Sequence, residues 1–122
     1  MYIEDNHTIG SMQAAFSSMF PWLRLTFYQP PSKTSEKPPS IKLSPTEKVG
    51  NVRATHNRGY IRLDDQLTVK GLLYILENIF GLYAQVERNS FGRWQKIPRN
   101  DPGTLKEHNV RGFLTNQQAI IS

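Results

Sequence analysis

Residues Thr8–Phe20, TIGSMQAAFSSMF, and residues Thr68–Phe80, TVKGLLYILENIF, carry one pattern sixty positions apart. Each stretch begins with threonine, spaces its apolar residues at helical intervals and ends in phenylalanine. Each therefore predicts an amphipathic helix with the threonine as its N-cap. Pro21 should end the first helix, and Gly81 in a left-handed conformation should end the second. The predicted apolar stripes are Ile9, Met12, Phe16, Met19 and Phe20, and Val69, Leu72, Leu76 and Phe80.

Strands are expected on both sides of each helix. Over Leu23–Phe27 apolar and polar residues alternate, and Leu82–Glu87 aligns with that stretch at an offset of fifty-nine. Such alternation is typical of a strand with one buried face. Shorter strands are expected before the helices, over Met1–Glu4 and Tyr60–Leu63.

The two helix–strand units predict a single domain built from an internal duplication, with repeats over about 1–59 and 60–112. Right-handed crossovers would place both helices on one face of a four-stranded sheet. The expected fold is an α+β two-layer sandwich with a ferredoxin-like βαββαβ plan. An extra hairpin strand, Arg93–Ile97, returns after the turn at Asn89–Gly92. Residues 113–122 are expected to form a C-terminal tail.

A second echo joins Gly50–Gly59, GNVRATHNRG, to Gly103–Gly112, GTLKEHNVRG. It predicts two short helical turns, capped by Asn51 and Thr104 and closed by glycines with positive φ. Between the halves, residues 29–40 contain four prolines and neither aromatic nor aliphatic residues. This composition predicts a flexible, extended loop.

Composition restricts the possible classes of protein. The chain has 122 residues, 38% of them hydrophobic, a net charge of +5 and no cysteine. Disulfides and thiol chemistry are therefore excluded. No apolar run approaches the length of a membrane span, and the acidic start MYIEDNHT does not resemble a secretory signal. We expect a cytoplasmic protein that has no membrane partner.

Catalytic and metal sites are not predicted. None of the phosphate-binding glycine loops, nucleophile elbows or zinc-protease motifs occurs in the sequence. His7, His56 and His108 stand apart, so they are expected to lie in solvent or to serve local turns instead of binding a metal. Asp64 and Asp65 precede the second helix and suit its positive N-terminal end. The prediction is a protein that is not an enzyme and uses no cofactor.

The hairpin region carries the first candidate binding surface. Its members are basic or aromatic, and no acidic residue interrupts them: Arg88, Phe91, Arg93, Trp94, Lys96 and Arg99. Cations of this kind neutralise phosphates and aromatic rings stack on bases, so the surface favours nucleic-acid binding. The alternative is a solvated edge whose charges prevent strand-to-strand aggregation, with Trp94 packed under the sheet.

The second helix carries the other candidate. It is apolar nearly all round, with Tyr74, Ile75 and Ile79 outside the main stripe. Either the long connections or the apolar C-terminal segment cover these side chains, or a partner does, and a homodimer is the second choice after intramolecular cover. The favoured interpretation is a small non-catalytic protein-binding or adaptor module, whose partner is another protein or a second copy of the chain; nucleic-acid binding is the alternative.

Overall fold

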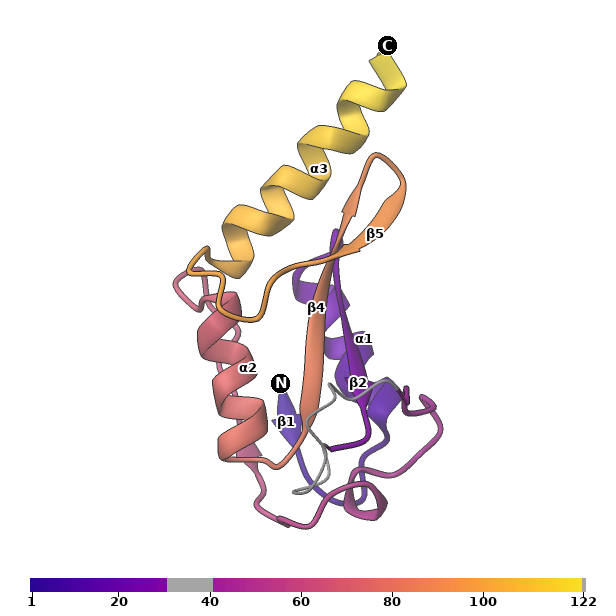
Figure 1. Cartoon of the computed structure of the whole chain (residues 1–122), viewed down its shortest axis with the longest axis vertical. Helices are drawn as coiled ribbons and strands as arrows, with labels where there is room; N and C mark the ends of the chain where they lie inside the picture. Colours follow the sequence, from indigo (N-terminus) through magenta and orange to yellow (C-terminus); the bar gives the residue numbers. More distant parts are fainter. Residues whose placement is uncertain (31–40, 122) are drawn as a thin grey trace.

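The computed structural model describes residues 1–30 and 41–121, and over these it is a mixed α+β protein with three α-helices and two antiparallel sheets (Figure 1). The elements in chain order are β1 (Tyr2–Ile3), α1 (Ile9–Met19), β2 (Leu23–Tyr28), the 3₁₀ turn η1 (Val49–Asn51), β3 (Gly59–Tyr60), α2 (Val69–Asn78), β4 (Tyr83–Ser90), β5 (Arg93–Lys96) and α3 (Leu105–Ile121).

Both predicted helices and their caps are confirmed. The Thr8 hydroxyl accepts the N–H of Ser11 at 3.1 Å, and the Thr68 hydroxyl accepts that of Gly71 at 2.9 Å. Gly81 follows α2 with a φ of 67°, as predicted. The stripes are buried with one exception: Met19 is 56% exposed. It is the last residue of α1, and the chain beyond it turns Phe20 inward instead.

The larger sheet has the strand order β2–β4–β5, and all its pairs are antiparallel. In its register Leu25 lies opposite Val86 and Phe27 lies opposite Ala84, so these four side chains share one face. That face and the stripes of α1 and α2 belong to one hydrophobic core. The opposite face of the sheet holds Arg24 and Glu87, which are also paired.

The four-stranded ferredoxin-like sheet was a wrong prediction for the described residues. β1 pairs only with β3, each two residues long, and β2 pairs directly with β4. Turn-forming residues explain the short strands: the His7 N–H donates to the Glu4 carbonyl, and the Asp64 carboxylate accepts two backbone N–H groups. The strands before the helices are therefore too short to widen the main sheet.

In each sheet, residues at equivalent positions of the two predicted repeats pair with each other. Thr26 pairs with Gln85, the residue that the fifty-nine-residue offset makes its equivalent. Met1 and Ile61, equivalent at the sixty-residue offset, exchange backbone hydrogen bonds of 2.8 and 2.9 Å. One such pair therefore lies in each of the two sheets.

The loops that contact the helix starts repeat as well. The Ile9 N–H donates to the Glu47 carbonyl at 2.9 Å, and the Val69 N–H donates to the Gly103 carbonyl at 3.0 Å. Glu47 and Gly103 therefore play the same role in the two halves, and they lie fifty-six positions apart, whereas the glycine echo has an offset of fifty-three. The echo is therefore not a structural equivalence.

Three expectations based on that echo fail. Asn51 ends η1 and caps nothing after it. Gly59 lies in β3 and Gly112 lies inside α3, and neither has a positive φ. Thr104 does cap α3, because its hydroxyl accepts the Glu107 N–H at 3.1 Å.

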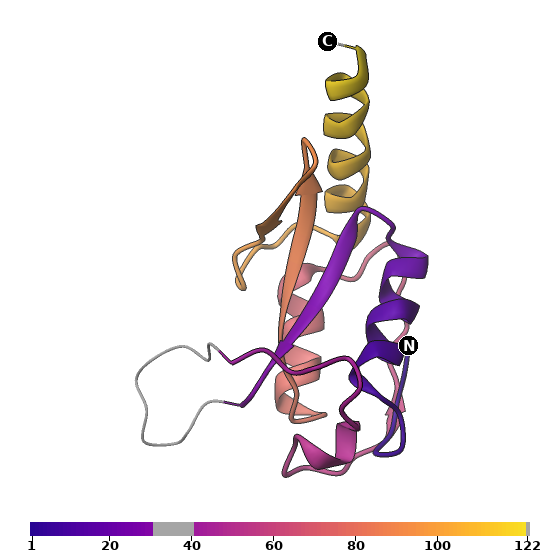
Figure 2. The same cartoon turned by 90° about the vertical axis from the view of Figure 1, so that its right-hand side faces the viewer.

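The expected C-terminal tail is instead the second half of α3, which projects past the β4–β5 hairpin (Figures 1 and 2). Gly112 allows this helix to approach the sheet closely. A Cβ there would lie 2.7 Å from the Trp22 Cβ and 3.1 Å from the Asn89 carbonyl oxygen. The proline-rich loop predicted over 29–40 lies outside the described residues, apart from Gln29 and Pro30.

Candidate functional site

The outward face of the β2–β4–β5 sheet carries three pairs of a cation and an aromatic ring. The Arg24 guanidinium lies 4.4 Å from the Trp94 ring, Lys96 Nζ lies 5.4 Å from the Tyr28 ring, and the Arg99 guanidinium lies 4.1 Å from the Tyr83 ring. We call this surface the cation–aromatic face; it consists of Arg24, Tyr28, Tyr83, Trp94, Lys96 and Arg99.

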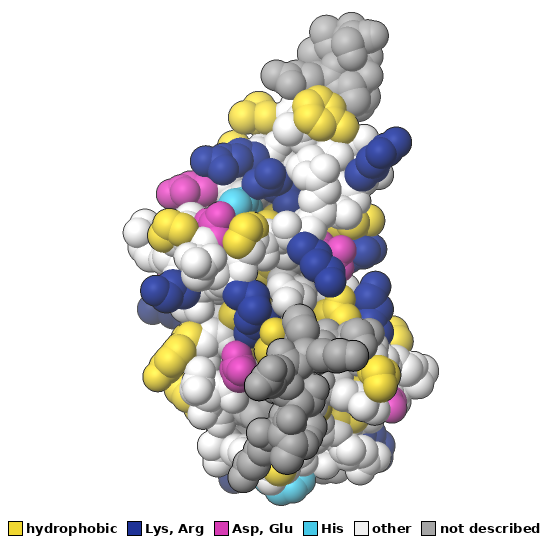
Figure 3. Space-filling model, in the orientation of Figure 1, with side chains coloured by type: hydrophobic (Ala, Val, Ile, Leu, Met, Phe, Trp, Pro, Cys, Tyr) yellow, Lys and Arg dark blue, Asp and Glu magenta, His cyan; other side chains and the backbone are white. Residues whose placement is uncertain are grey.

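The cations of this face differ in their acidic neighbours. Glu87 lies 3.3 Å from Arg24 and Glu77 lies 2.9 Å from Arg99, so both guanidinium charges are partly balanced. Lys96 makes no ion pair with any described residue. Lys and Arg side chains gather on the side of the molecule shown in Figure 3. This side therefore attracts anions.

The six hairpin residues predicted from the sequence do not form one surface. Arg88 and Arg93 pair with Gln95 and Ser90, and they lie on the face opposite to Trp94 and Lys96. This alternation is the one expected for a strand. The β4–β5 hairpin therefore presents basic residues on two sides.

Phe91 lies at the hairpin tip in an unusual conformation. Its φ is 54°, that of Gly92 is 79°, and its side chain is 59% exposed. Two-residue hairpin turns of this type require two positive φ angles, which asparagine and glycine adopt at lower cost. Phe91 therefore adopts a backbone conformation that is unfavourable for phenylalanine, and its ring is exposed.

A buried histidine holds Arg88 in place. His108 is 4% exposed, its Nδ1 lies 2.7 Å from Arg88 Nη1, and its Nε2 lies 3.0 Å from Asp101 Oδ1. A guanidinium can only donate, so Nδ1 accepts and Nε2 carries the proton. Of the two predicted places for His108, solvent is wrong, because α3 carries the ring inward; its bond to Asp101, which also accepts the Gly103 N–H, agrees with a role in the local turn.

A cavity of about 150 Å³ lies beside this histidine, between β5, α3 and the segment that joins them. Arg88 and Arg111 supply positive charge to its lining, and Asp101 supplies the one carboxylate; Lys96 also lines it, but its ammonium lies on the other face of the sheet, at Tyr28. Gly103 makes the arrangement possible, since a Cβ there would lie 2.8 Å from both Asp101 Oδ1 and His108 Nε2. We call this cavity the Arg88 cavity.

Asp101 is held as an anion. Its carboxylate accepts hydrogen bonds from His108 and, at 2.7 Å, from the Gly103 backbone N–H. These bonds lower the pKa of the Asp101 carboxyl below the ordinary 3.8. The negative charge of Asp101 is thus directed at His108 and the backbone instead of at Arg88.

A second network surrounds a buried arginine. The Arg53 guanidinium donates to Asp5 Oδ1 at 2.8 and 3.1 Å and to the Phe80 carbonyl at 2.9 Å. His56 lies 2.9 Å from the other Asp5 oxygen and is exposed, as expected. The bonds from Arg53 and His56 lower the pKa of Asp5. This network ties the segment after η1 to the end of α2, so its role is structural.

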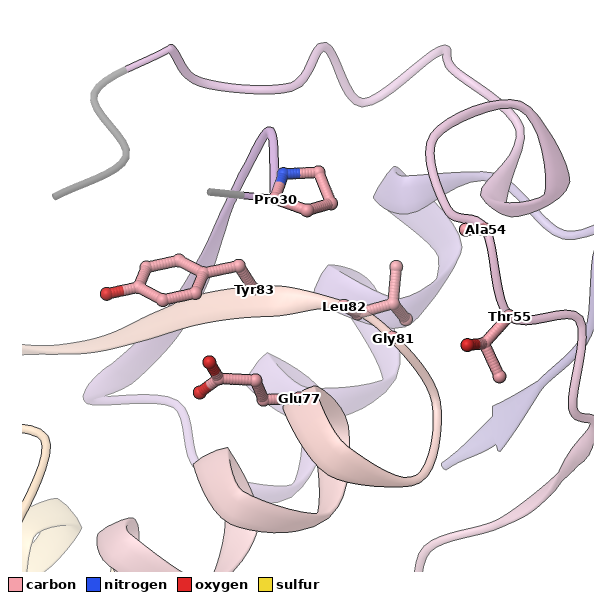
Figure 4. Close-up of a pocket in the computed structure, with 7 residues that line it drawn as sticks. All are labelled: Pro30, Ala54, Thr55, Glu77, Gly81, Leu82 and Tyr83. Carbon is pink, nitrogen blue, oxygen red and sulfur yellow. The ribbon is translucent and has the colours of Figure 1, made fainter. Parts of the chain in front are cut away.

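Another cavity, of about 210 Å³, lies at the end of α2 (Figure 4). Glu77 of α2 and Tyr83 of β4 form one side, and Ala54 and Thr55 from the segment after η1 lie across from Gly81. Its lining contains one ionisable carboxylate, Glu77, which is paired with Arg99. A pair of groups for acid–base chemistry is therefore absent from the described lining.

The apolar residues predicted on α2 do not form a single patch. Tyr74 and Ile79 are 63% and 46% exposed, whereas Ile75 packs against the core. Phe113 of the C-terminal segment does not cover Tyr74 and Ile79, because its ring packs edge-on against Trp22, with the ring centres 6.2 Å apart. The more compact exposed group lies on α3, where Val110, Phe113 and Leu114 are 44%, 44% and 51% exposed.

Sequence reasoning missed Arg24, Tyr83, Asp101, His108 and Arg111 as parts of these surfaces. Arg24 and Tyr83 lie on separate strands, and only their pairing brings them beside the hairpin. The spacing of Asp101 and His108 carries no known motif.

Within residues 1–30 and 41–121 no group of three His, Cys, Asp or Glu side chains could bind a metal ion. Over the same residues no helix combines the length and the apolar character that a membrane crossing requires. No protein-family model, no curated protein and no solved structure matches this chain.

Proposed function

We propose that the protein binds single-stranded nucleic acid across the cation–aromatic face. One observation carries the proposal: three cation–aromatic pairs lie on the face of a three-stranded sheet that is turned away from the hydrophobic core. Sheets that bind single strands combine cations for the phosphates with rings on which bases stack. The charge of +5 favours the same kind of partner.

The accessible rings define where bases would stack. Trp94 is 36% exposed, Phe91 is 59% exposed, and Tyr83 is partly exposed, whereas Tyr28 is buried and supports Lys96 from below. A base on Trp94 would also contact the Arg24 guanidinium, which lies over that ring. Stacking does not depend on base identity, so weak sequence preference is expected.

The test is a fluorescence anisotropy titration with labelled oligo(dT) and oligo(rU) of about fifteen nucleotides, at low salt. We expect the logarithm of the affinity to fall linearly with that of the salt concentration, as phosphate contacts require. Trp94→Ala should weaken binding by about 1–3 kcal/mol, the value of one stacked base. Lys96→Glu should weaken it and reduce the salt dependence.

Arg62→Glu is the matched control, because it changes charge by the same amount. Its side chain is 86% exposed, and it lies next to the β1–β3 sheet instead of the cation–aromatic face. Trp22 and Trp94 are the two tryptophans, so fluorescence quenching by the ligand should disappear in Trp94→Phe. Equal loss of affinity in Arg62→Glu and Lys96→Glu would contradict a specific face.

Self-association is the second candidate function, consistent with a protein-binding module. The exposed group Val110, Phe113 and Leu114 favours it, because these residues lie three and four positions apart on one side of α3. The predicted residues Tyr74, Ile75 and Ile79 offer less, since Ile75 is packed inward.

We also propose that the chain is one domain that arose by duplication of a helix–strand unit, with repeats over 1–59 and 60–112. The equivalent caps Thr8 and Thr68 and the central pairs Thr26–Gln85 and Met1–Ile61 support this origin.

A further inference from the structure

We infer that the Arg88 cavity binds a single carboxylate group, from a small organic acid or from the C-terminus of a peptide. The inference goes beyond the proposed function, because the cavity and the cation–aromatic face lie on opposite sides of the β4–β5 hairpin. Arg88 and its cross-strand partner Gln95 line the cavity beside α3. The Lys96 ammonium lies on the other side, at the Tyr28 ring.

Arg88 is the principal donor. Its Nε donates to the Ser90 hydroxyl at 3.0 Å and its Nη1 donates to His108, which fixes the plane of the guanidinium. Nη2 has no hydrogen-bond partner among the described residues. A planar guanidinium that is held rigidly with donor capacity left over suits a planar carboxylate, because little side-chain entropy is lost on binding. The Gln95 amide adds a neutral donor to the lining.

Arg111 supplies the second positive charge. It lies three residues after His108 on α3, so the two side chains share one side of that helix. Its charge lowers the pKa of Asp101, after the hydrogen bonds from His108 and Gly103, which agrees with its place in the lining. Arg111 makes no ion pair with any described residue, so its charge is available to a ligand.

The charge of the cavity matches a ligand with one negative charge. The two guanidinium groups of Arg88 and Arg111 stand against the one carboxylate of Asp101, and His108 is neutral in the tautomer that its hydrogen bonds require. A carboxylate would therefore neutralise the cavity. A phosphomonoester carries about −1.5 to −2 near neutral pH and would leave it negative.

The size of the cavity distinguishes a carboxylate from a phosphodiester, which also carries one negative charge. Its volume is about 150 Å³, which suits one small group at the end of a molecule. A carboxylate has a single covalent attachment, so the rest of its molecule can leave through the opening of the cavity. A phosphodiester has two attachments, and both would have to leave the same small space.

The experiment is a titration of the full chain with sodium acetate, in which acetate replaces chloride at constant ionic strength. The readout is the ¹H–¹⁵N NMR signals of the arginine Nε–H groups and of the glutamine side-chain amides. We expect saturable shifts at Arg88, Gln95 and Arg111, because a carboxylate accepts two parallel hydrogen bonds and chloride does not. The absence of saturable shifts at these three residues would overturn the inference.

Four variants test the location of the site. Arg111→Gln should weaken acetate binding roughly tenfold, the effect of one charge-assisted contact, whereas Lys106→Gln on the same helix should not, because Lys106 pairs with Asp65 outside the cavity. Gln95→Glu places a carboxylate in the cavity and should abolish binding. Gln85→Glu makes the same exchange on the opposite face of the sheet and should leave binding unchanged. Equal losses within either pair would overturn the site.

Peptides identify the source of the carboxylate. Tighter binding of N-acetyl-tetraalanine with a free C-terminus than of acetate assigns the cavity to a protein C-terminus, and equal affinity assigns it to small organic acids. Undiminished binding of the amidated peptide, or tighter binding of inorganic phosphate than of acetate, would overturn the inference. Because no oligonucleotide is used, these results are independent of whether the cation–aromatic face binds nucleic acid.

Discussion

Asp101 shows how single residues set the properties of the Arg88 cavity. Its carboxylate accepts bonds from His108 and Gly103, and these lower its pKa from the ordinary 3.8. The unfolded chain therefore binds a proton at Asp101 at a higher pH than the folded chain does. The resulting stability is complete above about pH 4 and is lost as the pH falls through the lowered pKa.

We predict that Asp101→Asn reduces the acid sensitivity of folding. Urea denaturation between about pH 2 and pH 5 should show a smaller fall in the free energy of unfolding for the variant, because one source of proton uptake is removed. Asp5→Asn should act in the same pH range, since Arg53 and His56 lower the pKa of Asp5. An identical pH dependence in wild type and Asp101→Asn would contradict the hydrogen-bonding role.

At the level of elements, the turn of the β4–β5 hairpin is destabilised by Phe91, whose exposed ring stands on a residue with a positive φ. Phe91 has a φ of 54°, which costs a residue with a Cβ about 1–2 kcal/mol. Asparagine tolerates this conformation and is favoured in such turns. Phe91→Asn should therefore raise the free energy of unfolding by about 1 kcal/mol, as measured by urea denaturation.

The same variant should bind single strands more weakly in the anisotropy titration, because one exposed ring is lost. Phe91→Tyr is the control, since it keeps both the ring and the backbone strain. Higher stability with unchanged binding in Phe91→Asn would mean that the Phe91 ring does not contact the bound strand.

For the whole molecule, the exposed group Val110, Phe113 and Leu114 predicts that α3 packs against a second copy of the chain. Light scattering across a dilution series should give a mass near 28 kDa if α3 mediates pairing, twice the 14.0 kDa of one chain. Val110→Ser with Leu114→Ser should then restore 14.0 kDa, whereas Tyr74→Ser should not. A constant mass of 14.0 kDa at all concentrations would exclude a stable homodimer.

The sequence by itself determined α1 and α2, their threonine caps, the strands that follow them and the alternation of side chains along the hairpin. Helical periodicity, capping and strand alternation are local properties, and residues such as Thr8 and Thr68 carry them within a few positions. The sequence repeat also aligned Thr26 with Gln85, but only the strand register showed that these two residues pair with each other.

Tertiary structure alone decided the sheets and the candidate site. Two-residue strands carry too little local signal to reveal that β1 pairs with β3 instead of joining the larger sheet. Long-range packing carries α3 over the sheet, where Gly112 fits against Trp22, and so buries His108 between Arg88 and Asp101. The free energy of such contacts depends on residues distant in the chain, which no local pattern brings together.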